Sequence, residues 1–259
     1  MPVYKHTEKC MVCGSALEYL LQAESHICIY CNKAEQGHVI CTAGHFVCDT
    51  CHGLEARGII EQIAFTSREN DPLAMAELMM SHVALPMLGC EHAFIAAGAL
   101  IGAVKNSPYG KGNITSASVQ EIFDRTAKQA VGGYCGLTGV CGIAPALGAC
   151  FSVFLGARCG SDREQKIVMD AVIRVMQALS ALTGPSCCKA YVRAGLREAV
   201  ALLGERFGIL LPIKDSKIVC KYSEKHSHGC REEKCPYFQK PIKDLFSGPG
   251  FVPGTVCTS

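Results

Sequence analysis

The stretch CTAGHFVCDTCH, residues 41–52, places three cysteines and two histidines within twelve residues. Two Cys-x2-Cys pairs precede it, Cys10 with Cys13 and Cys28 with Cys31. A Cys-x2-Cys turn holds two thiolates about one tetrahedral edge apart, and two such pairs complete a zinc shell. The spacing therefore predicts that this first part of the chain folds around metal.

Seven cysteines and His45 supply eight ligands, the number that two closed sites require. The expected sets are Cys28, Cys31, Cys48 and Cys51 for one ion, and Cys10, Cys13, Cys41 and His45 for the other. This order of ligands resembles a treble-clef or RING-like zinc finger. We expect two structural zinc ions, because about fifty residues bury too little apolar surface to fold without them. A rubredoxin-like iron site would use the same turns, and the spare histidines are His26, His38 and His52.

The composition indicates a sizeable buried core, since 49% of the 259 residues are apolar and 19% are charged. The net charge is +2 and no Lys/Arg stripe is visible, so no nucleic-acid partner is indicated. Eighteen cysteines would suit a secreted disulfide scaffold, but MPVYKHTEKC lacks the apolar segment of an export signal. We therefore expect a cytoplasmic protein whose cysteines are metal ligands or reactive thiols.

Residues 131–157 contain no charged side chain and are long enough to span a bilayer. The same stretch holds seven glycines, Pro145 and three cysteines, and it lacks flanking aromatic belts. A buried, glycine-rich helical segment explains these residues better than a membrane span, so no membrane association is expected.

The expected fold class is mainly α, with a zinc-finger module at 1–53, a multi-helix domain at 54–212 and a cysteine-bearing tail at 213–259 packed on that domain. Asp71-Pro72 predicts an N-cap and a first helical residue. Ser118 and Glu121 form a capping-box pattern. Apolar spacing predicts further helices at 90–104, 145–157, 162–182 and 186–207.

Two loci in the helical region combine cysteines with helix-breaking residues. Cys135 and Cys141 lie in the glycine-rich loop 132–142, and Cys187 and Cys188 open a helix for which Ser186 is the expected N-cap. Thiols in a first helical turn are expected to have a lowered pKa. The candidate catalytic residues are His82, His92, Cys135 and Cys141, although each histidine is equally explained as a core residue. Cys150 and Cys159 are interpreted as small buried apolar residues.

The tail carries Cys220, Cys230 and Cys235-Pro236, and a cysteine before proline is typical of the last ligand of ferredoxin-type clusters. The predicted cofactor-binding residues are Cys187, Cys188, Cys220, Cys230 and Cys235. Either an iron–sulfur cluster or a third zinc site that includes His226 or His228 would use them. Cys257 is expected to lie in a disordered end.

The motifs together resemble an uncharacterised cysteine-rich prokaryotic family, a domain of unknown function found mainly in anaerobic bacteria and archaea. The matching motifs are Cys41-x3-His45-Phe46-Val47-Cys48-Asp49-x-Cys51-His52, Pro86-x3-Cys90-Glu91-His92, Cys135-Gly136-x4-Cys141-Gly142, Gly184-Pro185-x-Cys187-Cys188 and Cys230-x4-Cys235-Pro236. The similarity is expected to cover nearly the whole chain. Relatives occur alone, joined to methyltransferase domains, or beside radical-SAM proteins. The resemblance implies anaerobic metal or sulfur metabolism without an assigned reaction.

Three functions remain open at this point. The first is a metalloprotein with structural zinc and an iron–sulfur or reactive-thiol site in the helical domain. The second is a non-enzymatic zinc-finger adaptor that binds a methyltransferase or radical-SAM partner. The third is a thiol redox sensor in which Cys187 and Cys188 form a strained, easily reduced disulfide.

Overall fold

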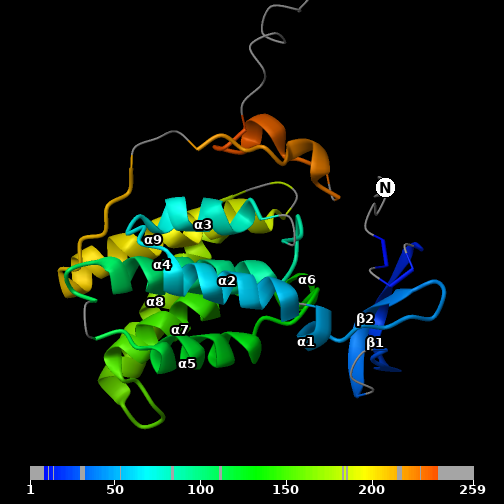
Figure 1. Ribbon diagram of the computed structural model, residues 1–259, viewed down its shortest axis with the longest axis horizontal. Coiled ribbons are helices and arrows are strands. Elements are labelled where there is room, and N and C mark those ends of the chain that lie inside the picture. Colours follow the sequence, from blue (N-terminus) through cyan, green and yellow to red (C-terminus); the bar gives the residue numbers. More distant parts are fainter. Residues whose placement is uncertain are drawn as a thin grey trace, which may run out of the picture.

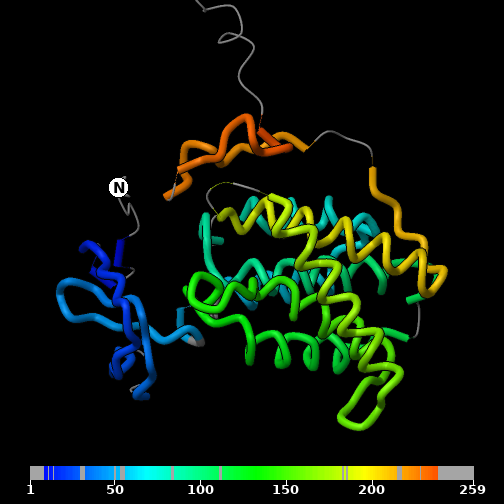
Figure 2. Tube along the Cα trace, turned by 180° about the vertical axis from the view of Figure 1, so that it is seen from behind, coloured from blue at the N-terminus to red at the C-terminus, as the bar shows by residue number. Residues whose placement is uncertain are grey.

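The structure is a computed structural model that describes residues 9–10, 12–13, 15–29, 33–52, 54–82, 85–110, 113–182, 184, 186–214, 218–227 and 229–238. A small β-hairpin module at the N-terminus lies beside a helical body, and the described C-terminal segment lies along the body's α3 and α9 side (Figures 1 and 2). The described part of the chain is therefore mostly helical, as the apolar periodicity predicted.

The N-terminal module, residues 9–52, is built on an antiparallel hairpin of β1 (Leu17–Ile27) and β2 (Ala34–Cys41). The register pairs Leu17 with Cys41 and Ile27 with Ala34, and it shifts between Tyr19 and Glu24. The short helix α1 (Asp49–His52) follows and leads toward the helical body. Most of β1 is exposed, so the apolar core of this module is too small to account for its folding.

The helical body contains eight further α-helices among the described residues. They are α2 (Leu54–Thr66), α3 (Pro72–Met80), α4 (Glu91–Asn106), α5 (Ser116–Ala127), α6 (Tyr134–Thr138), α7 (Ile143–Leu155), α8 (Asp162–Ser180) and α9 (Cys188–Phe207). The C-terminal segment adds two 3-10 turns, η1 (Ser223–Lys225) and η2 (Glu232–Lys234).

Helix α4 lies at the centre of the body, and every residue from Glu91 to Val104 is buried. It contacts α2, α3, α5, α7 and α9, and its alanines and glycines permit this close packing. A Cβ added at Gly102 would lie 2.6 Å from the Met75 Sδ and 3.1 Å from the Ala64 carbonyl oxygen. A helix that is apolar on all faces is therefore explained here by burial within protein.

The residues at 131–157 divide into α6 and α7, which are separated by a glycine-rich turn. Gly148 allows α7 to contact α8, because a Cβ there would lie 2.6 Å from the Val172 Cγ2. Among the described residues, no helix combines the length and the apolar character that a bilayer crossing requires.

Helix starts confirm one sequence prediction and correct two. Asp71 is the N-cap of α3, and its Oδ1 accepts hydrogen bonds from the backbone N–H of Leu73 at 2.8 Å and of Ala74 at 3.1 Å. The predicted Ser118–Glu121 capping box is wrong, since α5 begins one turn earlier with Thr115 as N-cap and Ser118 as its reciprocal partner. Ser186 is not the N-cap of α9; Cys187 occupies that position.

Candidate metal centres and a thiol-lined cavity

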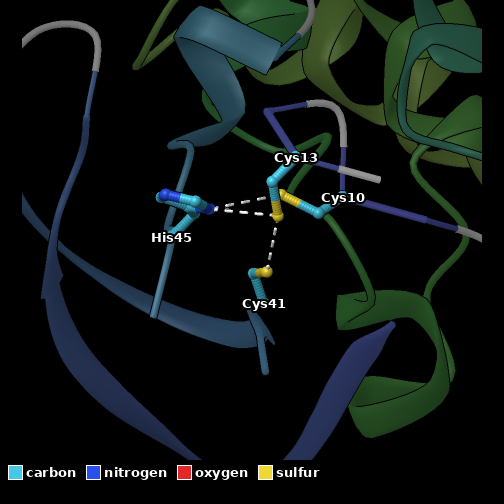
Figure 3. A group of neighbouring side chains, drawn as sticks. All are labelled: Cys10, Cys13, Cys41 and His45. Carbon is cyan, nitrogen blue, oxygen red and sulfur yellow. Dashed lines mark hydrogen bonds between the residues drawn. The ribbon is translucent and has the colours of Figure 1, made fainter. Parts of the chain in front are cut away.

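The first candidate metal centre consists of Cys10, Cys13, Cys41 and His45, whose ligand atoms all lie within 4.8 Å of one another. Their side chains converge from the loop before β1, the end of β2 and the turn that follows it (Figure 3). The Cys13 and Cys41 sulfurs are 3.5 Å apart, and the His45 Nδ1 lies 3.3 Å from the Cys13 Sγ and 3.9 Å from the Cys10 Sγ.

These distances fit a single tetrahedral ion. With metal–sulfur bonds of about 2.3 Å, the edge between two sulfurs of a tetrahedron is about 3.8 Å. The backbone also supports the thiolates, since Val12 N–H donates to the Cys10 Sγ at 3.4 Å and Ala43 N–H to the Cys41 Sγ at 3.3 Å. Hydrogen bonds from Ser15 lower the pKa of Cys13 to about 6, which favours the thiolate that a metal binds.

The second candidate centre brings together Cys28, Cys48 and Cys51, again within 4.8 Å of one another. Cys28 and Cys48 are buried with Phe46 in a small apolar cluster, and Cys48 N–H donates to the Cys28 Sγ at 3.4 Å. Cys31, the fourth ligand expected from the sequence, lies outside the described residues. Both groups of side chains could hold a metal ion.

The ligands of the two groups interleave along the chain. The first group uses the first Cys-x2-Cys pair and the Cys41/His45 pair, whereas the second uses Cys28 and the Cys48/Cys51 pair. The first group therefore joins the segments before and after the hairpin, and the second joins the connection between its strands to α1. Metal binding at either group would restrain the whole module rather than one local turn.

The module is attached to the helical body through α1. The Asp49 Oδ2 accepts a 2.9 Å hydrogen bond from the Gly132 N–H, at the start of the glycine-rich loop. The His52 Nδ1 lies 3.2 Å from the Glu91 Oε1, at the start of α4. These contacts place the second metal group next to the N-terminal end of the central helix.

A cavity of about 320 Å³ lies between the module and the body. The body contributes four thiols to its lining, and we call this cavity with its four cysteines the thiol cavity. The four are Cys90, Cys135, Cys141 and Cys188. The module contributes Cys41, His45, Asp49 and His52 among other side chains, so the first metal group borders the same space.

Helix ends and glycine turns bring the four thiols together. Cys90 is the N-cap of α4, and Cys188 is the first residue of α9. Cys135 lies in the single-turn helix α6, between Gly133 at φ 73° and Gly139 at φ 74°, backbone angles that only glycine adopts readily. Cys141 precedes α7, and the thiols therefore come from segments almost one hundred residues apart.

Three of the cavity thiols have raised pKa values, which favours their protonated form. Burial raises the pKa of Cys141 to about 11 and that of Cys188 to about 12, and it raises the pKa of Cys90 further. The expectation that the helix start lowers the pKa of Cys188 is wrong, because the loss of solvation outweighs the helix dipole there.

His92 also lines the cavity, and it is a neutral imidazole. Its Nδ1 lies 3.2 Å from the Gly89 carbonyl oxygen, so Nδ1 carries the proton and donates it. Nε2 accepts from the ammonium group of Lys189 at 3.4 Å. Burial, together with a smaller effect of the Lys189 charge, lowers the pKa of His92 to about 3. Burial likewise lowers the pKa of Lys189 to about 8.

Not every sequence candidate reaches the cavity. His82 is exposed just after α3 and is not part of the lining. Cys187 is not part of the cavity lining and packs with Tyr237, Cys220 and Cys235 of the C-terminal segment. Cys150 is buried as expected, whereas the expectation of burial for Cys159 is wrong, because it lies exposed in the turn between α7 and α8.

Sequence reasoning missed the polar side chains that hold these elements together. They include Asp49, Lys189 and Arg193, which link segments far apart in the chain. Lys189 and Arg193 lie four residues apart on one face of α9. Charged residues at this spacing normally form the solvent-facing side of an amphipathic helix. Their full burial has no signature in the local sequence.

The fold and the site define a helical body with a thiol-lined cavity that is bordered on one side by a cysteine-rich module whose side chains could hold metal ions. Comparison with protein families extends this description: the chain belongs to a family of unknown function, DUF5714, which matches residues 60–238. The match begins within α2 and ends directly after Cys235, Pro236 and Tyr237, so it covers the body and the described tail. The similarity does not include the N-terminal module, contrary to the expectation of nearly full coverage. Neither a curated protein nor a solved structure matches the chain.

Proposed function

We propose that this protein is a cytoplasmic metalloprotein of anaerobic metal or sulfur metabolism, in which the thiol cavity binds an iron–sulfur cluster. The observation that carries the proposal is the convergence of Cys90, Cys135, Cys141 and Cys188 on one cavity beside a metal-binding module. Two zinc ions in a treble-clef or RING-like arrangement would hold that module against the body and close the cavity.

The cavity thiols do not form a compact ligand group of the kind seen in the N-terminal module. Among the described side chains, the groups within 4.8 Å of one another are those of the N-terminal module and do not include these four thiols. A cluster holds its cysteines further apart than one ion does, because irons and sulfides lie between them. Cys135 is exposed in the structure, so the cavity also has one thiol near solvent.

The raised pKa values argue against a free cysteine nucleophile in the cavity. A protonated thiol attacks poorly, and Cys90, Cys141 and Cys188 are all held in that form by burial. A thiophilic metal or cluster displaces such protons when it binds. If bound there, an iron–sulfur cluster would supply electron transfer or an iron that acts as a Lewis acid.

The surrounding chain would restrict solvent and position a neutral hydrogen-bonding group. His92 keeps its proton on Nδ1, and the Lys189 ammonium beside it adds positive charge close to the thiols. Glu91 is 2% exposed, and its Oε2 has no hydrogen-bond partner among the described residues. This carboxylate occupies the space beside Gly89, where a Cβ would lie 2.1 Å from the Oε2.

The two other functions are supported less well. A sensor disulfide between Cys187 and Cys188 is disfavoured because the two thiols face different surroundings. A zinc-finger adaptor that binds a methyltransferase or radical-SAM protein would need only the N-terminal metal groups. It would leave the convergence of four thiols in the body without a role.

Anaerobic purification with analysis of iron, acid-labile sulfide and zinc tests the proposal. We expect a broad absorption band near ~400 nm that is weaker, together with lower iron and sulfide, in Cys141→Ser and in Cys188→Ser, with zinc content unchanged. Cys150→Ser is the control, because Cys150 is a buried thiol of the same helical body that lies outside the cavity lining. Zinc without iron or sulfide in the wild-type protein would overturn the cluster and favour the adaptor.

A further inference from the structure

The C-terminal segment 218–238 contacts the body through a small apolar cluster and through contacts between cations and aromatic rings. Lys189 lies 4.4 Å from the ring centre of Tyr222, Arg193 4.9 Å from that of Tyr237, and Arg231 5.5 Å from that of Tyr191. Tyr222 also donates a 3.0 Å hydrogen bond to the Met80 carbonyl oxygen. These contacts fix where the segment lies on α3 and α9 (Figure 1).

Beneath this segment, Cys187, Cys220 and Cys235 pack with Ala190 and Tyr237 in one cluster. Cys187 comes from the start of α9 and the other two from the segment, so the thiols join two parts of the chain. The Cys220 N–H donates a 2.8 Å hydrogen bond to the Tyr237 carbonyl oxygen, which joins the two ends of the segment.

The backbone around the segment's cysteines repeats the geometry seen in the N-terminal metal groups. At Cys10 and Cys41, the N–H two residues later donates to the sulfur. Tyr222 N–H donates to the Cys220 Sγ in the same way at 3.4 Å, and Glu232 N–H to the Cys230 Sγ at 3.4 Å. Such bonds stabilise negative charge on sulfur, as metal-bound thiolates require.

The turn at Cys230 is also strained. Glu232 has φ 49°, and among the residues that the structure describes it is the one non-glycine with a positive φ. A left-handed conformation is costly for a residue with a side chain, and it persists where the surroundings enforce it. Here the conformation places the Glu232 N–H against the Cys230 sulfur.

Positive charge surrounds these thiols. Arg193 is 1% exposed and donates to Glu77 at 2.6 and 2.9 Å, and its guanidinium also contacts Cys220. Arg231 is buried and close enough to Cys187 to interact with its charge. Four thiolates around a divalent ion or a cluster carry net negative charge, which these guanidinium groups would balance.

From these observations, we propose that Cys187, Cys220, Cys230 and Cys235 form a further four-thiolate metal centre that fastens the C-terminal segment to α9. The centre is separate from the thiol cavity and does not depend on the function proposed for it. Cys187, Cys220 and Cys235 lie together but are not within the 4.8 Å spacing of the N-terminal groups. An iron–sulfur cluster is therefore the occupant that this spacing fits better than a single zinc ion.

Thiol alkylation of the anaerobically purified full-length protein tests the site at the level of single residues. Cys220, Cys230 and Cys235 are partly exposed, so bare thiols would react with iodoacetamide. We expect them to react at least about tenfold faster after a chelator removes the metal, because only then are they free to attack. Exposed Cys159 is the internal control and reacts equally in both states. Equal rates for the three segment cysteines before and after chelation would overturn the proposal.

Metal analysis of variants separates this centre from the others. Cys235→Ser and Cys230→Ser should each lower the iron and sulfide content relative to the wild-type protein, while the zinc of the N-terminal module stays. Cys13→Ser should lose zinc yet keep the segment cysteines protected from alkylation. If Cys235→Ser lost only zinc, the segment would hold a metal centre, but that centre would not be an iron–sulfur cluster. Unchanged metal content in both Cys235→Ser and Cys159→Ser would exclude the centre.

Discussion

Cys187 and Cys188 are neighbours in the sequence, but their thiols belong to two different sites. Cys188 lines the cavity with Cys90, Cys135 and Cys141, whereas Cys187 packs beneath the C-terminal segment with Cys220 and Cys235. The start of α9 causes this division, because Cys187 is the N-cap with extended backbone and Cys188 is already helical. One helix end therefore connects the cavity to the segment.

The first prediction follows from that division. Cys188→Ser should reduce the cofactor bound in the cavity and leave the alkylation protection of Cys220 and Cys235 unchanged. Cys187→Ser should have the reverse effect, because it removes a ligand on the other side of the helix start. Iron and sulfide analysis combined with peptide mapping measures both. Identical effects of the two substitutions would mean that the two cysteines serve one site.

The second prediction concerns removal of metal from the N-terminal module. Chelation should abolish the hydrogen-exchange protection of residues 17–41, because the hairpin has no sizeable apolar core of its own. Helices α4 and α7 should stay protected, since their buried side chains belong to the large core of the body. Exchange measured by mass spectrometry resolves the two regions. Unchanged protection of the hairpin after complete metal removal would contradict structural zinc.

The third prediction addresses the attachment of the module to the body. Asp49→Ala removes the acceptor for the Gly132 N–H and leaves that donor near the cavity without its partner. We expect a loss of stability of about 1–2 kcal/mol and faster proteolysis between the module and α2. Asp124→Ala is a suitable control, because Asp124 makes an exposed contact with Gln120 within α5. Equal proteolysis rates for the two variants would show that the Asp49 contact does not hold the module.

The fourth prediction concerns the buried ion pair between Arg193 and Glu77. Glu77→Ala would leave the Arg193 guanidinium buried without its carboxylate, so we expect at least about 2 kcal/mol of destabilisation, measured by urea unfolding. Arg193 also lies over the Tyr237 ring, and the C-terminal segment should therefore lose exchange protection. Glu121→Ala removes the exposed pair with Arg125 and should cost less than about 1 kcal/mol. Similar losses of stability in Glu77→Ala and Glu121→Ala would show that the buried pair contributes no more than an exposed one.

The fifth prediction is a pH dependence that originates at His92. Its pKa is about 3 in the folded protein, against about 6.5 in an unfolded chain. The unfolded state therefore binds a proton first as the pH falls, and the stability that the neutral histidine contributes is lost between about pH 6.5 and 3. The His92→Gln variant lacks this contribution of the neutral histidine, so the stability of the variant should decline less steeply over that pH range. The free energy of unfolding of both proteins is measured by denaturant unfolding in a pH series. Parallel curves of this free energy against pH would exclude His92 as the origin of the pH dependence.

Local signals predicted several elements of the structure well. Asp71 followed by Pro72 fixed the start of α3, because the cap and the proline act within one turn. The capping of α5 was misassigned because Thr115 and Ser118 satisfy the same geometry one turn before Ser118 and Glu121. Cys159 was expected to be buried, yet it is exposed in the turn between α7 and α8, next to Gly160 at φ 85°.

The sequence by itself determined the helical character of the body and the cysteine spacings that pair side chains within a module of fifty residues. Both depend on short-range geometry, namely the helical period and the reach of a Cys-x2-Cys turn. Only the tertiary structure decided that Cys188 faces the cavity and Cys187 the tail, and that Lys189 and Arg193 are buried. Those outcomes depend on how α3, α4, α9 and the C-terminal segment pack together, and contacts between residues a hundred positions apart leave no mark on local spacing.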